Sequence, residues 1–445
     1  MRGRIAARSC TAHIATHALP FDVLLARVQA DFPDSDMNLP RHAHLQHWTI
    51  VEDCLVVGGI NLTRLAQRVG TTPFYAYDRG LIDSRIGLLR KGLPEGVKLH
   101  YAVKANPMPA LVCHLADCVD GLDVASGGEL SVALDSGMDP QTISYAGPGK
   151  SEAELHRAVA AGVLLNIESR REAEILTSVS KDYGLAARVA LRINPDFELK
   201  SSGMRMGGGP SPFGIDAATA PALLECIGKA GLAFEGFHIY AGSQNLRADA
   251  ICEAQRQAVA LALDLAKDAP GQVRILNIGG GFGIPYFPGD EHLDLGPVHA
   301  NLRALVDQVG TALPQAHLAI ELGRYLVGEA GVYVCRVIDR KVSHGKVFLV
   351  TDGGMHHHLA ASGNFGQIIR KNYPVVIGNR VRGGRRERAS VVGPLCTPLD
   401  VLADQMELAE AYPGDLVVVF QSGAYGYTAS PSAFLGHPPA LETLV

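Results

Sequence analysis

The chain has 445 residues, of which 47% are hydrophobic and 19% are charged, and its net charge at pH 7 is −5. This composition is typical of a globular protein with a large core, and the length is too great for one small domain. It excludes a strongly basic nucleic-acid-binding protein and a surface attracted to acidic membranes, and no apolar run is long enough to cross a bilayer.

The N-terminal residues 1–36 have the composition of a leader. The first 21 residues contain several arginines and no acidic residue. An organelle transit peptide can look like this, but the apolar centre of a secretory signal is missing. We interpret residues 1–36 as a disordered leader or as an extension from an upstream start codon, with the native start at Met37.

The next segment, residues 37–75, begins its β-type pattern with the hairpin-like run "WTIVEDCLVVGG". We expect this segment to join a β domain that is built by the C-terminal part of the chain.

Between residues 76 and 324, short β-type runs alternate with longer runs that are rich in Ala, Leu and Glu. Eight strands are predicted, at residues 97–105, 121–126, 142–147, 163–169, 187–195, 234–242, 274–282 and 316–324. Strands that alternate with helices indicate parallel βαβ units, and eight such units are typical of a (β/α)8 barrel of the TIM type. A doubly wound sheet is the alternative, but it rarely needs so many regular repeats.

After residue 324 the chain changes to β-rich runs that are separated by turns. Predicted strands lie at residues 331–342, 346–354, 373–378, 389–396 and 415–425. Residues 325–445 are therefore expected to form an all-β C-terminal domain.

Polar side chains stand at the C-terminal ends of the predicted barrel strands, where the active sites of such barrels lie. Strand one ends at Lys104, strand six carries His238 and strand eight ends with Glu321. Strand seven runs into "GGGFG", residues 279–283, whose bare backbone N–H groups suit a phosphate. A lysine that can form a Schiff base, a phosphate cradle and a carboxylate together indicate pyridoxal 5′-phosphate (PLP). The alternatives are a lysine that ends its strand in solvent and a histidine that only packs in the core.

Six motifs in order relate the chain to a known family: "YAVKAN", "GLDVASGGEL", "GGGFG", "ELGR", "GPLC" and "GAYG". With them, residues from about 45 to 445 resemble the fold-type III PLP-dependent amino-acid decarboxylases, the group that contains the diaminopimelate and ornithine decarboxylases and has the alanine racemase-like fold. The resemblance implies that Lys104 forms the Schiff base and that Glu321 contacts the pyridine nitrogen. It also implies a homodimer with shared active sites, in which Cys396 from the partner subunit protonates Cα.

The resemblance also implies the remaining site residues. The catalytic residues are expected to be Lys104, Cys396 and His238. Cofactor contacts are expected from Lys104, Asp123, His238, Ser243, Gly280, Gly281, Glu321, Arg324 and Tyr425. Substrate contacts are expected from Arg324, Asn364, Thr397 and Tyr425. His357, in a loop that is expected to face the active site, either contacts the substrate or only forms part of that loop.

The sequence departs from the diaminopimelate decarboxylases where they contact the distal end of the substrate. Thr397 stands in place of a glutamate, and Ala360 and Asn364 stand in place of an arginine and a tyrosine. His238 and Ser243 are also two residues further apart than is usual. This pattern is similar to that of a subgroup of the family that acts on modified amino acids, for example a glutamyl group on an acyl carrier protein. The subgroup also includes exosortase-associated members.

The predicted function is PLP-dependent α-decarboxylation of an amino acid or amino-acid derivative, small or carrier-linked, with release of CO2 and an amine. The main alternative is a diaminopimelate decarboxylase that makes lysine. An amino-acid racemase is disfavoured because racemases of this fold place an arginine at the position of Glu321. A non-catalytic homologue is disfavoured because Lys104, the glycine run and Cys396 are all retained.

Neither a metal site nor a disulfide framework is predicted. Three consecutive histidines, His356, His357 and His358, cannot easily face one ion. The eight cysteines are scattered without a C-x-x-C pair, which favours the cytoplasm. No nucleic-acid or membrane partner is expected.

Overall fold

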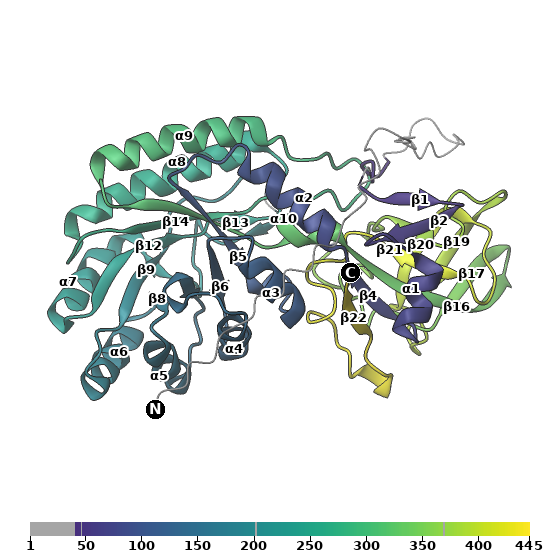
Figure 1. The fold of residues 1–445 in the computed structure, drawn as a ribbon, viewed down its shortest axis with the longest axis horizontal. Coiled ribbons are helices and arrows are strands. Elements are labelled where there is room, and N and C mark those ends of the chain that lie inside the picture. Colours follow the sequence, from purple (N-terminus) through teal and green to yellow (C-terminus); the bar gives the residue numbers. More distant parts are fainter. Residues whose placement is uncertain (1–40, 46, 201–202, 368–369) are drawn as a thin grey trace, which may run out of the picture.

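The computed structural model describes residues 41–45, 47–200, 203–367 and 370–445. The interpretation of residues 1–36 as a leader lies outside these described residues. The described chain forms a closed parallel barrel and a separate, mostly β domain, which lie side by side in Figure 1. The predicted fold class, a TIM-type barrel followed by a β domain, is confirmed. Within the described ranges, no helix is both long and apolar enough to cross a membrane.

Eight parallel strands form the barrel, and the pairing of β8 with β9 closes the ring. They are β5 (Val97–Ala102), β6 (Gly121–Val124), β7 (Ile143–Tyr145), β8 (Leu164–Ile167), β9 (Arg188–Asn194), β12 (Ala233–Ile239), β14 (Ile275–Gly280) and β15 (His317–Leu322). Each overlaps one of the eight predicted runs. Three two-residue strands accompany them: β10 (Met204–Arg205), β11 (Ile215–Asp216) and β13 (Gly242–Ser243).

Helices surround the barrel, with α8 and α9 lying side by side along one flank (Figure 1). The helices of this domain are α2 (Arg79–Arg90), α3 (Pro109–Ala116), α4 (Gly127–Asp135), α5 (Glu152–Ala161), α6 (Arg170–Tyr183), α7 (Ala220–Ala230), α8 (Ala248–Leu265), α9 (Leu295–Ala312) and α10 (Arg324–Val327). Local sequence sets several starts, because Ser126, Ser151 and Ser169 each accept an N–H from the first turn of α4, α5 and α6. Helices α5, α6 and α7 end at glycines with positive φ.

The interior of the barrel changes from apolar to polar along the strands. Four strands contribute an apolar layer that forms a small cluster apart from the main core: Leu164, Ala190, Ile275 and Ala319. Side chains two residues apart on a strand face the same side. The next inward layer is therefore formed by residues two positions further along, which are all buried and polar: Asn166, Arg192, Asn277 and Glu321. This polar layer lies toward the C-terminal end of the barrel.

The second domain combines segments from both ends of the described chain. Its sheet contains β16 (Gly331–Ser343), β17 (Lys346–Thr351), β18 (Val375–Ile377), β19 (Arg386–Val392), β20 (Val401–Ala409) and β21 (Leu416–Val419). Strand β4 (Phe74–Tyr77) pairs with β16 and with β22 (Leu441–Leu444). The small sheet β1 (Thr49–Val51), β2 (Cys54–Val57) and β3 (Ile60–Asn61), with α1 (Leu62–Val69), packs in the same region, as the purple and yellow ribbons of Figure 1 show.

Candidate functional site

Lys104 lies directly after β5, in a single 3-10 turn that spans Val103–Ala105. Its Nζ is 3.6 Å from Oε1 of Glu321, which stands near the end of the neighbouring strand β15. The side chain of Lys104 is 42% exposed, whereas that of Glu321 is 7% exposed. The amine is therefore accessible from solvent but directed toward a buried acid, unlike a lysine that only ends a strand in water.

The groups around Glu321 keep it ionised. Its Oε2 is 3.2 Å from Nε2 of His238, on β12. Burial opposes ionisation, but Lys104, His238 and Arg192 outweigh burial and lower the pKa of Glu321 to about 2. Desolvation favours the neutral amine of Lys104, but the Glu321 carboxylate outweighs it and raises the pKa of Lys104 above its usual value. Glu321 is thus a carboxylate near neutral pH and can accept a hydrogen bond from a protonated ring nitrogen.

Two further ion pairs lie inside the barrel. Arg192 donates to Oε1 of Glu168 at 2.8 Å, and Oε2 of Glu168 accepts the N–H of Gly214 at 3.0 Å. Nδ1 of His100 lies 3.3 Å from Oδ1 of Asp123. Oδ2 of Asp123 is buried and has no partner in the described part of the chain. Asp123 is therefore placed inside the barrel with one acceptor atom unused.

Tyr240 connects Lys104 with the segment that follows β12. The Lys104 Nζ is 5.4 Å from the centroid of the Tyr240 ring. Ser243 lies three residues further on, in the short strand β13. Nδ1 of His238 is buried and, among the described residues, has no partner.

The glycine run after β14 brings bare backbone to the end of β15. A Cβ on Gly280 would lie 2.1 Å from the carbonyl oxygen of Glu321. Gly281 has a φ of +75°, and a Cβ there would lie 2.6 Å from the carbonyl oxygen of Gly242. The N–H of Asn245 also donates to the Gly281 carbonyl at 2.9 Å, which fixes the turn against the Ser243 segment. Only glycine fits at these two positions.

Arg324 begins α10 and is enclosed by tyrosines. Its guanidinium carbon is 4.7 Å from the centroid of the Tyr425 ring and 5.6 Å from that of Tyr286, whose hydroxyl is 3.2 Å from Nη1. Tyr425 belongs to the β domain, and its N–H donates to the carbonyl of Ala105 at 2.8 Å. The β domain thus reaches the residue after Lys104. The Nε of Arg324 is buried without a partner in the described chain.

These groups fit the parts of PLP. The amine of Lys104 can bind its aldehyde, and the anionic Glu321 suits a protonated pyridine nitrogen. The glycine turn and the guanidinium of Arg324 suit a phosphate. Oδ2 of Asp123, Nδ1 of His238 and Nε of Arg324 are buried without hydrogen-bond partners in the described chain, and a bound polar cofactor would supply such partners.

Cys396 lies in the loop between β19 and β20, and its side chain is exposed. The structure does not bring it to Lys104 by any contact within the described chain. Asn364, from a second loop, donates through Nδ2 to the carbonyl of Leu399 at 3.2 Å. The same two loops expose apolar side chains, Phe365 at 47% and Leu399 at 57%.

The histidine run is buried inside the β domain. Nε2 of His358 is 2.9 Å from Oγ of Ser422, and Nε2 of His357 is 2.8 Å from the carbonyl of Pro438. Neither ring nitrogen of His356 has a partner in the described part of the chain. Burial lowers the pKa of both His356 and His358 to about 3. The run therefore packs as three buried rings, of which His357 and His358 have separate partners, and His357 is placed in the domain interior.

One group of possible metal ligands occurs elsewhere in the described chain. Atoms of Asp83 on α2, His114 on α3 and Cys118 just after α3 lie within 4.8 Å of one another. Nε2 of His114 is 2.7 Å from Oδ1 of Asp83, and the Cys118 thiol donates to the His114 carbonyl. Ordinary hydrogen bonds account for this group.

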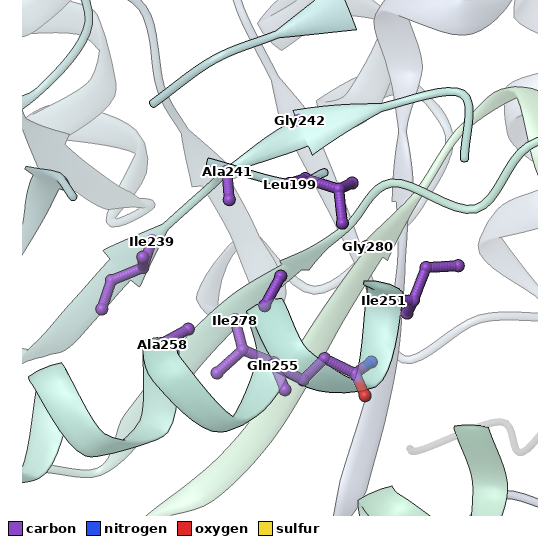
Figure 2. Close-up of a pocket in the computed structure, with 10 residues that line it drawn as sticks. Leu199, Ile239, Ala241, Gly242, Ile251, Gln255, Ala258, Ile278 and Gly280 are labelled. Carbon is purple, nitrogen blue, oxygen red and sulfur yellow. The ribbon is translucent and has the colours of Figure 1, made fainter. Parts of the chain in front are cut away.

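A small cavity lies between the glycine turn and helix α8 (Figure 2). Its volume is about 20 Å³, and its lining includes Gly242, Gly280 and the amide of Gln255. A space of this size admits about one water molecule. The cavity is therefore a small gap between the glycine turn and α8, and it is too small for an organic ligand.

Sequence reasoning missed Tyr240 and Tyr286 of this site, and also Asp400 beside the Cys396 loop. The signal for Tyr240 was its position two residues after His238, which places both on the same side of the chain. Tyr286 follows the glycine turn closely, but only the fold brings it to Arg324. Asp400 ends the run "CTPLD" and is buried under the Cys396 loop.

Comparison with known proteins gives consistent matches. Residues 79–328 match the family described as pyridoxal-dependent decarboxylase, pyridoxal binding domain. The decarboxylase of L-glutamyl-BtrI acyl-carrier protein from Niallia circulans is 39% identical over 389 residues, which cover 86% of this chain and 90% of the relative. A diaminopimelate decarboxylase of Aquifex aeolicus is 35% identical, with 88% and 90% covered. The crystal structure of diaminopimelate decarboxylase from Helicobacter pylori complexed with L-lysine matches with a TM-score of 0.75 at 26% identity, covering 86% and 94%.

Proposed function

The chain belongs to the pyridoxal-dependent decarboxylases, and from that premise we propose roles for its individual residues. It is a PLP-dependent carboxy-lyase that acts on an amino acid or an amino-acid derivative. We assign Lys104 as the lysine that binds the cofactor and Glu321 as the acceptor for the pyridine N–H. The observation that carries this proposal is the 3.6 Å approach of the Lys104 amine to the buried Glu321 carboxylate beside the glycine turn.

The chemistry divides between the cofactor and the chain. Bound PLP supplies an electron sink for the pair that remains when the bond from Cα to the carboxylate breaks. Glu321 holds a proton on the ring nitrogen, and His238 supports the ring and the orientation of Glu321. Gly280, Gly281, Ser243, Arg324 and Tyr425 would hold the phosphate, and the unpartnered Oδ2 of Asp123 would accept a hydrogen bond from a donor group of the cofactor away from the phosphate.

We propose that Cys396 completes the reaction from the partner subunit of a homodimer. After CO2 leaves, Cα must receive a proton from a positioned acid, and a thiol can supply it. Cys396 is exposed in one chain, and the two loops joined by Asn364 and Leu399 also expose the apolar side chains of Phe365 and Leu399. A second copy of the chain would cover these side chains and bring the thiol to the other site.

The substrate that we favour is an amino acid whose distal end is modified and uncharged. The loops 353–367 and 393–399, which carry Asn364, Thr397 and Cys396, contain no Asp, Glu, Lys or Arg. The 39% identical relative is named for a glutamyl group on an acyl carrier protein. Diaminopimelate is the second candidate, because a 35% identical relative is named for it.

We also propose a cytoplasmic location. All seven cysteines in the described part of the chain are free, which suits a reducing compartment.

A CO2-release assay of the purified holoenzyme tests the proposed function. We expect turnover with a carrier-linked glutamyl substrate and less with diaminopimelate, ornithine or lysine. Lys104→Ala should abolish turnover and the visible absorbance of bound cofactor, because no other residue can replace the covalent link. The control is Lys98→Ala, an exposed lysine on β5, which should retain both turnover and absorbance. Full turnover in Lys104→Ala would contradict the assignment.

A further inference from the structure

Asp400 is a buried carboxylate, four residues after Cys396, that joins two loops of the β domain. Its Oδ2 accepts the N–H of Leu395 at 2.9 Å, and its Oδ1 accepts the N–H of Met355 at 2.6 Å. Its own N–H donates to the carbonyl of Thr397 at 3.3 Å. The residues immediately before and after Cys396 are therefore both held by Asp400.

We propose that Asp400 is the positioning residue for the Cys396 thiol, an inference that rests on the proposed role of Cys396 as the acid. The Cys396 side chain is exposed. The direction of the thiol must then be set by the backbone of its loop, which Asp400 holds at Leu395 and Thr397. Proton transfer requires the donor to stand within hydrogen-bond reach of Cα, so a small displacement of this loop would slow the reaction.

Two glycines let the backbone approach the Asp400 carboxylate closely. A Cβ on Gly354 or on Gly393 would lie 2.2 Å from an oxygen of Asp400. The N–H of Gly393 also donates to the Asp400 carbonyl at 3.0 Å, which closes the loop that carries Cys396. Because Gly354 and Gly393 have no side chains, the Asp400 carboxylate can bind the Cys396 loop and the loop of the histidine run at the same time.

The carboxylate is the suitable group because both of its partners are donors. An ionised carboxylate has acceptors on both oxygens, and its hydrogen bonds to N–H groups are stronger than neutral ones. An asparagine of the same shape would present an NH2 group to one of the two N–H groups. One buried donor would then lose its acceptor, and the loop would shift.

A second aspartate in the same domain provides a matched control. Asp415 is buried and accepts the N–H of Tyr412 at 2.9 Å and the amide of Asn379 at 2.8 Å. Both of its oxygens therefore also act as acceptors, one for a backbone N–H in the turn between β20 and β21 and one for the side-chain amide of Asn379. Asp415→Asn should lower the melting temperature and leave kcat unchanged.

The test compares four PLP-loaded variants: Asp400→Asn, Cys396→Ala, the double variant and Asp415→Asn. We expect Asp400→Asn to retain the visible absorbance and KM but to lower kcat by roughly 10-fold or more. In the Cys396→Ala background the same substitution should cause no further loss, because the thiol that it positions is gone. A residue that only stabilised the fold would lower kcat by the same factor in both backgrounds.

The outcomes separate this inference from the proposed function. An unchanged kcat in Asp400→Asn, or an equal loss in both backgrounds, would overturn the positioning role. An unchanged kcat in Cys396→Ala would instead overturn the proposed acid. If Asp400→Asn does not accumulate as holoenzyme, Asp400→Ser, which leaves room for a water, takes its place. Failure of both to fold while Asp415→Asn folds would assign Asp400 to the fold and reject the inference.

Discussion

Glu321 is the residue on which the charges of the site converge, since Lys104, His238 and Arg192 all favour its ionised form. Glu321→Gln keeps the shape but removes the charge that holds a proton on the cofactor ring. We expect the variant to retain the visible absorbance of the cofactor bound to Lys104 and to lose about 100-fold or more in kcat. The visible absorbance measures cofactor binding, and CO2 release by the same preparation measures kcat.

The control for this substitution is Glu329→Gln. Glu329 is as buried as Glu321, at 7% exposure, but it pairs with Arg85 outside the site. Its replacement should lower the melting temperature and preserve kcat. A Glu321→Gln enzyme with the turnover of the unaltered protein would contradict the role assigned to Glu321.

The loop that carries the histidine run gives the β domain a pH-dependent stability. His356 and His358 have folded-state pKa values of about 3, because burial disfavours their charged forms. In the unfolded chain a histidine titrates near pH 6.5. Between about pH 6.5 and about pH 3, each of these histidines is protonated in the unfolded state and neutral in the folded state. The free energy of unfolding therefore decreases, as the pH falls, by up to about 1.4 kcal/mol per pH unit for each histidine.

Urea unfolding at several pH values between 7 and 4.5 would measure this slope. His356→Phe should flatten it with little effect at pH 7, because neither ring nitrogen of His356 has a partner in the described chain. His344→Asn, in an exposed turn between β16 and β17, should leave the slope unchanged. An equal slope in all three proteins would contradict the neutral, buried state of His356.

The elements that could be predicted from the sequence are those that local pattern determines. Each barrel strand is a short apolar run, and the polar residues at the strand ends, such as Lys104 and Glu321, marked the site. Strand β20 was not predicted, because its sequence "VLADQMELA" mixes polar and apolar residues on both sides of the strand. The pairing of β4 with β22 joins opposite ends of the chain, and periodicity carries no signal for such contacts.

At the scale of the whole molecule, the site is assembled from distant parts of the chain. Tyr425 reaches the Ala105 carbonyl from the β domain, but Cys396 of the same domain remains on the surface. Sequence reasoning could nominate Cys396 but not Asp400, because the N–H groups that Asp400 binds are brought together only by folding. Because the Cys396 thiol is exposed and does not contact Lys104 of its own chain, we propose that it acts at the site of a second copy of the chain.

A mixed dimer tests this shared site directly. Lys104→Ala and Cys396→Ala chains with different tags are co-expressed, and the dimer that carries both tags is purified and loaded with PLP. If the thiol acts across the interface, one of the two sites combines an intact Lys104 with an intact Cys396. The mixed dimer should then recover about half of the activity of the unaltered dimer, although each parent is nearly inactive. A mixed dimer of Lys104→Ala with a chain that carries both Lys104→Ala and Cys396→Ala should recover none, because neither site then holds an intact Lys104. If the thiol acted within its own chain, both sites of the first mixed dimer would lack one residue, and the absence of recovery would refute the proposed arrangement.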